Sequence, residues 1–224
     1  MSLRFRLARM PRRWQIAVAA GIVVLAMAAA WGWRALSPTP ASPPRYVEVG
    51  HGAYTLPRPD PIADFDLVRH DGRPFTNGAL TGRWTFLVFG YTYCPDFCPT
   101  TLAVFNQIHG LLARQPDGGR EVQFVMVTVD PERDTAAQIA AYVPQFNPAF
   151  IGVTGTKAMI GRLADSVGAD HHRHAPDSGG NYLIDHSTAV LLVNPQGRVQ
   201  GVFAPQHDAA DMVKAFAKIR ASAP

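Results

Sequence analysis

The chain has 224 residues, of which 47% are hydrophobic and only 17% are charged. This composition is typical of a packed globular protein and excludes an intrinsically disordered one. The formal charge of +4 is unevenly distributed, because six of the 21 basic residues precede residue 41, where no acidic residue occurs. The 15 basic residues that remain are matched by 17 acidic ones, so the rest of the chain offers no strongly basic surface and we expect no nucleic-acid partner.

A long apolar segment follows the basic N-terminus. Gln15 to Trp33 contains no charged side chain, and a helix of this length would extend about 28 Å, enough to cross the hydrocarbon layer of a membrane. Five arginines precede the segment and only Arg34 follows it closely, which places the N-terminus in the cytoplasm. We therefore predict a basic cytoplasmic arm over residues 1–13 and a single transmembrane helix, the anchor, over 14–33.

A cleaved signal peptide is the alternative, because the small residues of AMAAA have the spacing of a cleavage site. On either interpretation the rest of the chain is exported. We expect a single-pass protein of the inner membrane, with its C-terminal domain in the periplasm.

Residues 34–60 are rich in proline, which precludes a helix and favours a stiff, extended tether. A domain is predicted over 61–224. In chain order, its pattern predicts a strand and turn at 64–72, a strand at 84–91, a helix at 100–112, a strand at 121–129, a helix at 135–142, a strand at 150–153, a helix at 157–166, a hairpin at 187–203 turning at 194–197, and a helix at 208–219. This order predicts an α/β domain with a thioredoxin-like sheet.

Both cysteines of the chain, Cys94 and Cys98, lie in CPDFCP, between the first buried strand and its helix. Pro99 disfavours helical geometry at Cys98 but suits the first position of a helix, so we expect both sulfurs in the loop that precedes the helix. The helix dipole and the free N–H groups there favour the thiolate. Three uses remain open: a structural disulfide, a redox disulfide between Cys94 and Cys98, and a metal site.

The spacing and the chemistry of the two sulfurs favour a metal. Thioredoxin-type enzymes have one residue fewer between their cysteines, and two thiolates are too few for a closed zinc site. Cu(I) accepts soft donors, so two sulfurs and one imidazole are a suitable set. His186 is the candidate third donor, because it stands where a loop enters a strand whose end would lie beside the cysteines. A hydrogen-bonded histidine at a strand start is the alternative.

Two other polar clusters each have a structural and a functional interpretation. Asp130 ends the strand at 121–129; it fits a turn before the next helix, capped by Asp134 or Thr135, or a supporting group that orients a metal ligand. HHRH, at residues 171–174, fits a solvated loop, although its imidazoles could also collect Cu(II) transiently.

Three motifs, in this order, carry a family resemblance: GYTYCPDFCPTTL, VTVDPERDT and YLIDHSTAVLLVNPQGR. They are similar to motifs of the Sco (SenC) proteins, membrane-anchored copper chaperones of cytochrome c oxidase assembly. The resemblance implies a thioredoxin-like fold in which Cys94, Cys98 and His186 bind one copper ion, as Cu(I) or Cu(II), with Asp130 in a supporting role. It also implies a partner, the oxidase subunit that carries the binuclear copper site, and leaves the upstream copper donor unknown.

Two functions therefore remain. A metallochaperone would pass copper to the oxidase by thiolate exchange. A thiol-disulfide oxidoreductase would cycle Cys94 and Cys98 between dithiol and disulfide, and would reduce the cysteines of the oxidase before the metal arrives. A peroxidase on the same fold is less favoured, because it would need one activated cysteine and has no use for His186.

Overall fold

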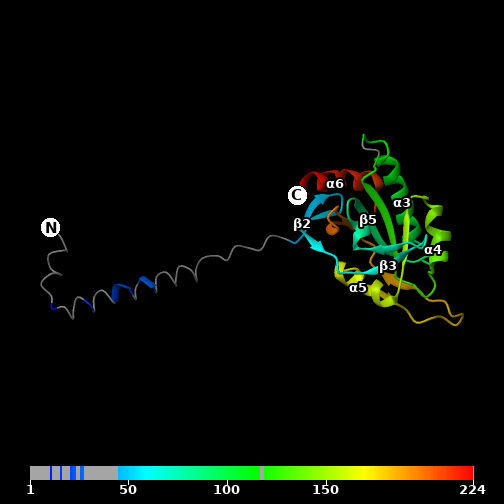
Figure 1. Ribbon diagram of the computed structural model, residues 1–224, viewed down its shortest axis with the longest axis horizontal. Helices are drawn as coiled ribbons and strands as arrows, with labels where there is room; N and C mark the ends of the chain where they lie inside the picture. Colours follow the sequence, from blue (N-terminus) through cyan, green and yellow to red (C-terminus); the bar gives the residue numbers. More distant parts are fainter. Residues whose placement is uncertain are drawn as a thin grey trace. The chain divides into compact units, whose positions relative to one another are not determined.

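The computed structural model describes residues 45–116 and 119–223, together with Pro11, Ile16, Gly21–Val23 and Ala26–Met27. Most of the predicted arm, most of the predicted anchor and the first part of the predicted tether lie outside the described residues, and all three stay predictions. Within the described part of the chain, no helix has both the length and the apolar character needed to cross a membrane. The described residues from Arg45 onward belong to one compact unit, in which helices cover both faces of a sheet (Figure 1).

A nine-stranded sheet forms the centre of this unit, in the order β1-β2-β11-β10-β5-β6-β7-β3-β4. Its strands are β1 Val47–Gly50, β2 Ala53–Pro61, β3 Asp66–Arg69, β4 Pro74–Thr76, β5 Trp84–Gly90, β6 Val122–Thr128, β7 Ile151–Thr154, β10 Val190–Val193 and β11 Arg198–Phe203. The pairs β5–β6 and β6–β7 are parallel, whereas the other pairs are antiparallel. A second, two-stranded sheet pairs β8 His171–Arg173 with β9 Ile184–His186.

Two helices connect the parallel strands, as such connections require: α3 Phe97–Leu112 joins β5 to β6, and α4 Ala136–Tyr142 joins β6 to β7. α5 Lys157–Val167 follows β7 and leads to β8, and α6 Ala209–Ser222 closes the domain; two short 3-10 turns are η1 Asn77–Leu80 and η2 Val143–Gln145. The predicted α/β domain with a thioredoxin-like arrangement is therefore what the chain adopts, and the strands, helices and hairpin predicted from residue 84 onward all occur within about three residues of their predicted bounds.

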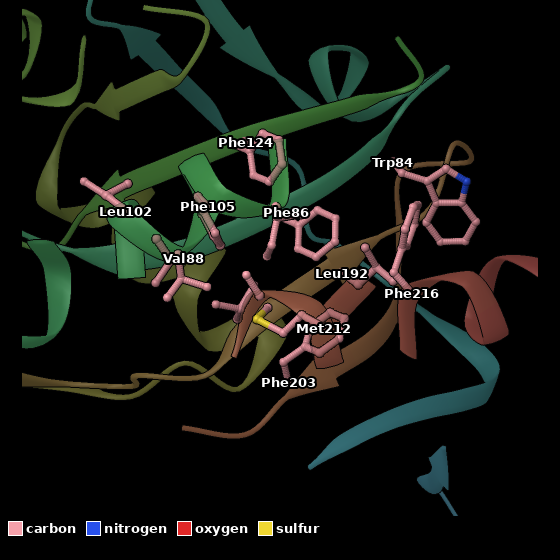
Figure 2. Close-up of a cluster of buried hydrophobic side chains, with 14 of the residues drawn as sticks. Trp84, Phe86, Val88, Leu102, Phe105, Phe124, Leu192, Phe203, Met212 and Phe216 are labelled. Atoms are coloured by element: carbon pink, nitrogen blue, oxygen red, sulfur yellow. The ribbon is translucent and has the colours of Figure 1, made fainter. Parts of the chain in front are cut away.

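Two hydrophobic cores lie on the two sides of the sheet, because alternate side chains of a strand face opposite ways. From β5, Phe86 enters the core beneath α3 and α6, whereas Phe89 enters the core that includes α5. In the first core the ring of Phe86 stacks on Phe124 at 5.3 Å and on Phe203 at 5.6 Å between centroids (Figure 2). Burial on both faces makes β5 a rigid support for the loop that follows it.

The tether predicted over 34–60 is too long, because β1 and β2 pair into the sheet. The prediction rested on prolines at 38, 40, 43 and 44, whereas β2 has three prolines of its own, at 57, 59 and 61. Beyond Thr55, β2 pairs with β11 alone, so it is an edge there. Prolines at alternate positions of an edge can turn their missing N–H groups away from the neighbouring strand, so they do not prevent pairing.

The predicted start of α3 is also wrong. The helix begins at Phe97, so Cys98 is its second residue and Pro99 its third, and only Cys94 stays in the loop. A proline is tolerated in the first turn because the N–H groups of that turn have no partner within the helix. Cys98 is thereby fixed by the helix, whereas Cys94 is held by the loop.

HHRH is not simply a solvated loop, because β8 pairs with β9 in the register His171 to His186 and Arg173 to Ile184. Both strands have three residues and lack the apolar alternation that predicts a strand. The two strands are about ten residues apart in the chain. Their pairing cannot be recognised from the sequence pattern of either segment alone.

Candidate metal centre

Three side chains from three different segments meet at one end of the sheet. Cys94 lies in the loop after β5, Cys98 in the first turn of α3, and His186 at the end of β9. Their donor atoms all lie within 4.8 Å of one another, and Cys98 Sγ is 3.5 Å from His186 Nε2. Both cysteines are free thiols. The structure thus brings together the three residues that the sequence analysis put forward as ligands.

A glycine allows Cys98 to approach the end of β5. A Cβ atom on Gly90 would lie 2.7 Å from Cys98 Sγ, closer than real Cβ contacts come. Any larger residue would displace the sulfur or the helix that carries it. The sequence analysis did not single out Gly90, because a glycine at a strand end is a common turn signal. Only the approach of α3 reveals its role.

Tyr91, the next residue, supports His186 from the other side. Its ring is 2% exposed and meets the His186 ring edge to face, with centroids 5.7 Å apart and an angle of 88°. Its hydroxyl oxygen accepts a hydrogen bond from the backbone N–H of Ile184 at 3.3 Å. The loop after β5 and the strand β9 are therefore connected directly at the site.

The orientation of His186 suits a metal ligand. Its Nδ1 lies 3.0 Å from the carbonyl oxygen of Ser187, which accepts a hydrogen bond and so requires a proton on Nδ1. Nε2 then carries the lone pair in the neutral ring and faces the sulfurs. Metal-binding histidines are commonly fixed in this way, with the other ring nitrogen donating to a carbonyl or carboxylate.

The two thiols share one proton unequally. A hydrogen bond from the Cys98 thiol lowers the pKa of Cys94 to about 3, although burial acts in the opposite direction. The same hydrogen bond raises the pKa of Cys98 far above its usual range, and burial adds to this effect. Cys94 is thus a thiolate at neutral pH, whereas Cys98 keeps its proton until a metal ion displaces that proton.

The charge on Cys94 also affects the imidazole. Burial alone would lower the pKa of His186, but a hydrogen bond with the Cys94 thiolate, followed by the one to the Ser187 carbonyl, raises it overall. The site therefore stabilises a negative sulfur beside a positive ring. A divalent cation that replaced the protons of Cys98 and His186 would keep the net charge of the site, whereas Cu(I) would leave it one unit more negative.

Asp130, the predicted supporting residue, forms no hydrogen bond or ion pair with Cys94, Cys98 or His186. It is 2% exposed, and its carboxylate accepts hydrogen bonds from the Tyr182 hydroxyl at 2.8 Å and from Arg133 Nε at 2.5 Å. Tyr182 lies two residues before β9. Asp130 therefore contacts the segment that leads to His186 rather than His186 itself.

The acid beside the cysteine loop is Asp134. Its carboxylate accepts hydrogen bonds from the backbone N–H and the hydroxyl of Thr92, at 2.9 and 2.6 Å, and from the Thr128 hydroxyl at 2.6 Å. Burial raises the pKa of Asp134. Thr135, not Asp134, caps α4 by accepting from the N–H of Gln138. The sequence suggested only that Asp134 or Thr135 caps this helix. Because both residue types suit a cap, the sequence did not show that Asp134 instead bonds to the cysteine loop.

A cleft of 430 Å³ opens at the site and is lined by Cys94, Phe97, Leu183, His186 and others, but not by Cys98. Cys94 is half-buried and Cys98 is only 3% exposed. Phe97 and Leu183 are 54% and 55% exposed, so the cleft has an apolar rim. An incoming group reaches Cys94 first.

Comparison with known proteins places this geometry in a family. The family model described as SCO1/SenC matches residues 55–221. The mouse "Protein SCO2 homolog, mitochondrial" is 34% identical over 153 residues, which are 68% of this chain and 60% of the mouse protein. The chain thus spans less than two-thirds of the length of that relative, and half the length of the bovine homologue.

Two solved structures have the same fold. The structure of Arabidopsis thaliana ScoI with copper bound is 31% identical, with a TM-score of 0.67, and the match covers 72% of this chain and 99% of that one. The structure of yeast Sco1 with copper bound is 27% identical, also with a TM-score of 0.67, and the match covers 74% of this chain and 91% of that one. With three-quarters of its length matched by the family model, the chain belongs to the SCO1/SenC family.

Proposed function

We propose that this protein is a copper chaperone that binds one copper ion through Cys94, Cys98 and His186 and transfers it to the binuclear copper site of cytochrome c oxidase. The convergence of the three donors within 4.8 Å carries the proposal. Donor atoms that lie about 2.0–2.3 Å from an ion are about 3.5–4 Å from one another, so only a small closure is needed. The two relatives with copper bound support copper as the ion.

The donor set favours Cu(I) as the cargo. Two sulfurs and one imidazole are soft ligands, and the Cys94 thiolate is already formed in the free protein. Cu(II) also accepts imidazole and thiolate, so both oxidation states remain within the proposal.

Transfer would begin at Cys94. It is the sulfur that lines the cleft, so a thiolate of the partner can bind the ion there while buried Cys98 still holds it. Exchange of one sulfur at a time passes the ion without releasing it into solution. The exposed apolar side chains beside the cleft, Phe97 and Leu183, suit contact with a protein surface.

A second function, thiol-disulfide oxidoreductase, is favoured by the same difference between the two sulfurs: Cys94 is an accessible thiolate, whereas Cys98 is a buried thiol. The Cys94 thiolate would attack a disulfide of the partner, form a mixed disulfide and release one partner thiolate. Cys98, after losing its proton, would attack Cys94 Sγ, release the second partner thiolate and leave a Cys94–Cys98 disulfide. Two electrons pass to the partner, and an external dithiol must restore the pair.

Anaerobic titration with Cu(I) tests the three-donor site. The untagged, full-length, reduced chain is titrated against a chromophoric Cu(I) chelator, and we expect one tightly bound ion. His186→Ala should weaken binding by about a hundredfold, because even residues that only orient ligands contribute tenfold to a hundredfold. His51→Asn is the matched control: it removes a histidine that pairs with Asp211, and asparagine tolerates the positive φ of that position. Parent affinity in His186→Ala would contradict the site.

A transfer assay then separates the two functions. The copper-loaded chain is mixed with the reduced oxidase subunit, and the optical spectrum of the binuclear site is followed. A chaperone should transfer copper from the parent protein and not from His186→Ala. An oxidoreductase should instead reduce the oxidised subunit with both proteins, since His186 forms no bond in that reaction.

We also propose that the domain is exported and held by the predicted anchor over residues 14–33. In intact cells, a maleimide that cannot cross the inner membrane should label Cys94, and mass spectrometry should find the N-terminal residues retained. A mature N-terminus near Trp31 would show that the segment is a cleaved signal peptide.

A further inference from the structure

The β8–β9 hairpin places imidazole and carboxylate groups together outside the cysteine site. Its register pairs His171 with His186 and His172 with Asp185. Because side chains alternate along a strand, His172 and Asp185 share the face opposite to that of His186. The backbone N–H of His174 donates to the carbonyl of Leu183 at 3.0 Å, which continues the ladder by one pair and puts His174 on the same face as His172.

The three side chains are already neighbours. His174 Nε2 is 2.8 Å from Asp185 Oδ2, and the rings of His172 and His174 are 5.6 Å apart at an angle of 83°. The side chains of His174 and Asp185 are 49% and 75% exposed, so both can rotate without disturbing a packed core. A pocket of 420 Å³ at the edge of the hairpin is lined by His172 and Asp185, by His171 and His186 of the other face, and by Asp170, which adds a second carboxylate nearby; His174 does not line it.

The arginine of the HHRH segment, Arg173, does not face this cluster. Arg173 stands between the two histidines in the chain, but alternation directs it to the other face. There its guanidinium pairs with Glu132 at 2.5 Å and stacks over the ring of Tyr182 at 4.2 Å. The face that carries His172, His174 and Asp185 is therefore not opposed by the charge of Arg173.

We infer that His172, His174 and Asp185 form a second metal site, which takes a divalent ion of the Cu(II) and Zn(II) class. Two nitrogens and one carboxylate oxygen suit these ions, whereas the thiolates of the cysteine site suit Cu(I). Donors about 2.1 Å from a tetrahedral ion are about 3.4 Å apart, so the bond between His174 and Asp185 must lengthen by about half an ångström, and His172 must turn toward it. No cysteine takes part, so the inference stands apart from the proposed function.

The position of this site links it to His186. Asp185 directly precedes His186 in β9, so an ion on the outer face would be bound to the same short strand that presents the inner ligand. The hairpin would then collect an oxidised or divalent ion from solvent on the strand that also carries His186, the third donor of the cysteine site. In Figure 1 this segment is part of the yellow-to-orange chain at the lower edge of the domain.

Titration with Cu(II) and, separately, with Zn(II) tests the second site without the first. The untagged full-length Cys94→Ser/Cys98→Ser variant is used, with glycine as a competing ligand, and the parent protein with its cysteines oxidised to a disulfide serves as a second preparation. We expect one bound ion with an electron paramagnetic resonance signal of nitrogen and oxygen ligands for Cu(II). His172→Ala and His174→Ala should each weaken binding by about tenfold or more.

The matched control is His51→Asn, which removes another exposed histidine–aspartate pair, His51 with Asp211 at 3.1 Å. Its affinity should equal that of the parent. Binding that survives both His172→Ala and His174→Ala, or that falls equally in His51→Asn, would overturn the inference and leave a solvated histidine cluster. Because the thiols are absent or oxidised throughout, failure here leaves the Cu(I) result untouched, and failure of the Cu(I) site leaves this test intact.

Discussion

The backbone N–H of Ile184 donates a hydrogen bond to the hydroxyl oxygen of Tyr91, 3.3 Å away. Tyr91 follows β5 and precedes Cys94, whereas Ile184 begins the strand that ends at His186. This bond therefore connects the segment that carries the cysteines to the segment that carries the histidine. We therefore expect it to help fix the distance between the sulfur and imidazole donors.

Tyr91→Phe should separate these segments while keeping the ring. The variant leaves the buried N–H of Ile184 without its partner, which costs about 1 kcal/mol of unfolding free energy. Because β9 would then hold His186 less firmly, we expect about fivefold weaker Cu(I) binding, measured by chelator competition. Tyr93→Phe is the control, because Tyr93 is 55% exposed and its change should leave both values unchanged. Equal effects in the two variants would show that the hydroxyl of Tyr91 has no special role.

Gly90→Ala should disturb Cys98. The added methyl group would lie 2.7 Å from Cys98 Sγ, so the sulfur or the first turn of α3 must move. We expect a loss of about 1–3 kcal/mol in unfolding free energy and Cu(I) binding weakened by about tenfold. Chemical denaturation and chelator competition measure the two effects.

The control for this change is Gly110→Ala, in the last turn of α3. A Cβ atom there has no neighbour within 4 Å, so the variant should be at least as stable as the parent, with a gain of up to about 0.5 kcal/mol, and bind Cu(I) as the parent does. If Gly90→Ala also retains the parent affinity, the close approach of Cys98 to β5 is not needed for metal binding.

The parts of the fold that could be predicted are those with strong local patterns. β5 and β6 are continuous apolar segments, and the hairpin of β10 and β11 has a clear turn, so each was recognisable on its own. The cysteines and His186 were identified from their chemistry and from the order of three motifs. Their meeting at one end of the sheet follows from the topology that those elements define.

The parts that could not be predicted depend on contacts between distant segments. β2 is a strand because β11 supplies its hydrogen bonds, whereas its own sequence is dense in proline. Gly90 is needed because α3 approaches it closely, and Asp130 is hydrogen-bonded to Tyr182, 52 residues later in the chain. Neither relationship leaves a pattern in the local sequence.

Alkylation of Cys94 should be nearly independent of pH. Its pKa is lowered to about 3 by the hydrogen bond from Cys98, so the reactive thiolate is present throughout pH 5–8. An ordinary thiol, with a pKa of about 8.5, would react about tenfold faster for each unit of pH over this range. Iodoacetamide and mass spectrometry of the reduced, metal-free protein give the rate at each residue.

Cys98→Ala provides the comparison. It removes the donor that contributes most to the lowered pKa of Cys94, so the pKa should rise and the alkylation rate should begin to increase with pH. Cys98 itself should stay unreactive in the parent, because it is 3% exposed and its pKa is raised. A parent rate that climbs steadily from pH 5 to 8 would contradict the shared proton.

Asp130 and Tyr182 should act on copper binding as a single unit. The Tyr182 hydroxyl donates to Asp130 at 2.8 Å, and the Tyr182 ring lies between two guanidinium groups, with Arg133 at 3.7 Å and Arg173 at 4.2 Å from its centroid. These contacts fix the residue that stands two positions before β9. The carboxylate of Asp130 bonds to Tyr182 and Arg133 and to neither cysteine nor His186, so we expect any effect of Asp130 on His186 to pass through Tyr182 and the strand.

A double-mutant cycle tests this route. Asp130→Asn and Tyr182→Phe should each weaken Cu(I) binding, and the double variant should be no weaker than the worse single one. The resulting coupling should be at least about 0.5 kcal/mol, as for other residues in direct contact. Tyr46→Phe, at an exposed tyrosine, should have no effect. Additive losses would mean that Asp130 reaches the site by another path, whereas coupling assigns its supporting role to the positioning of β9.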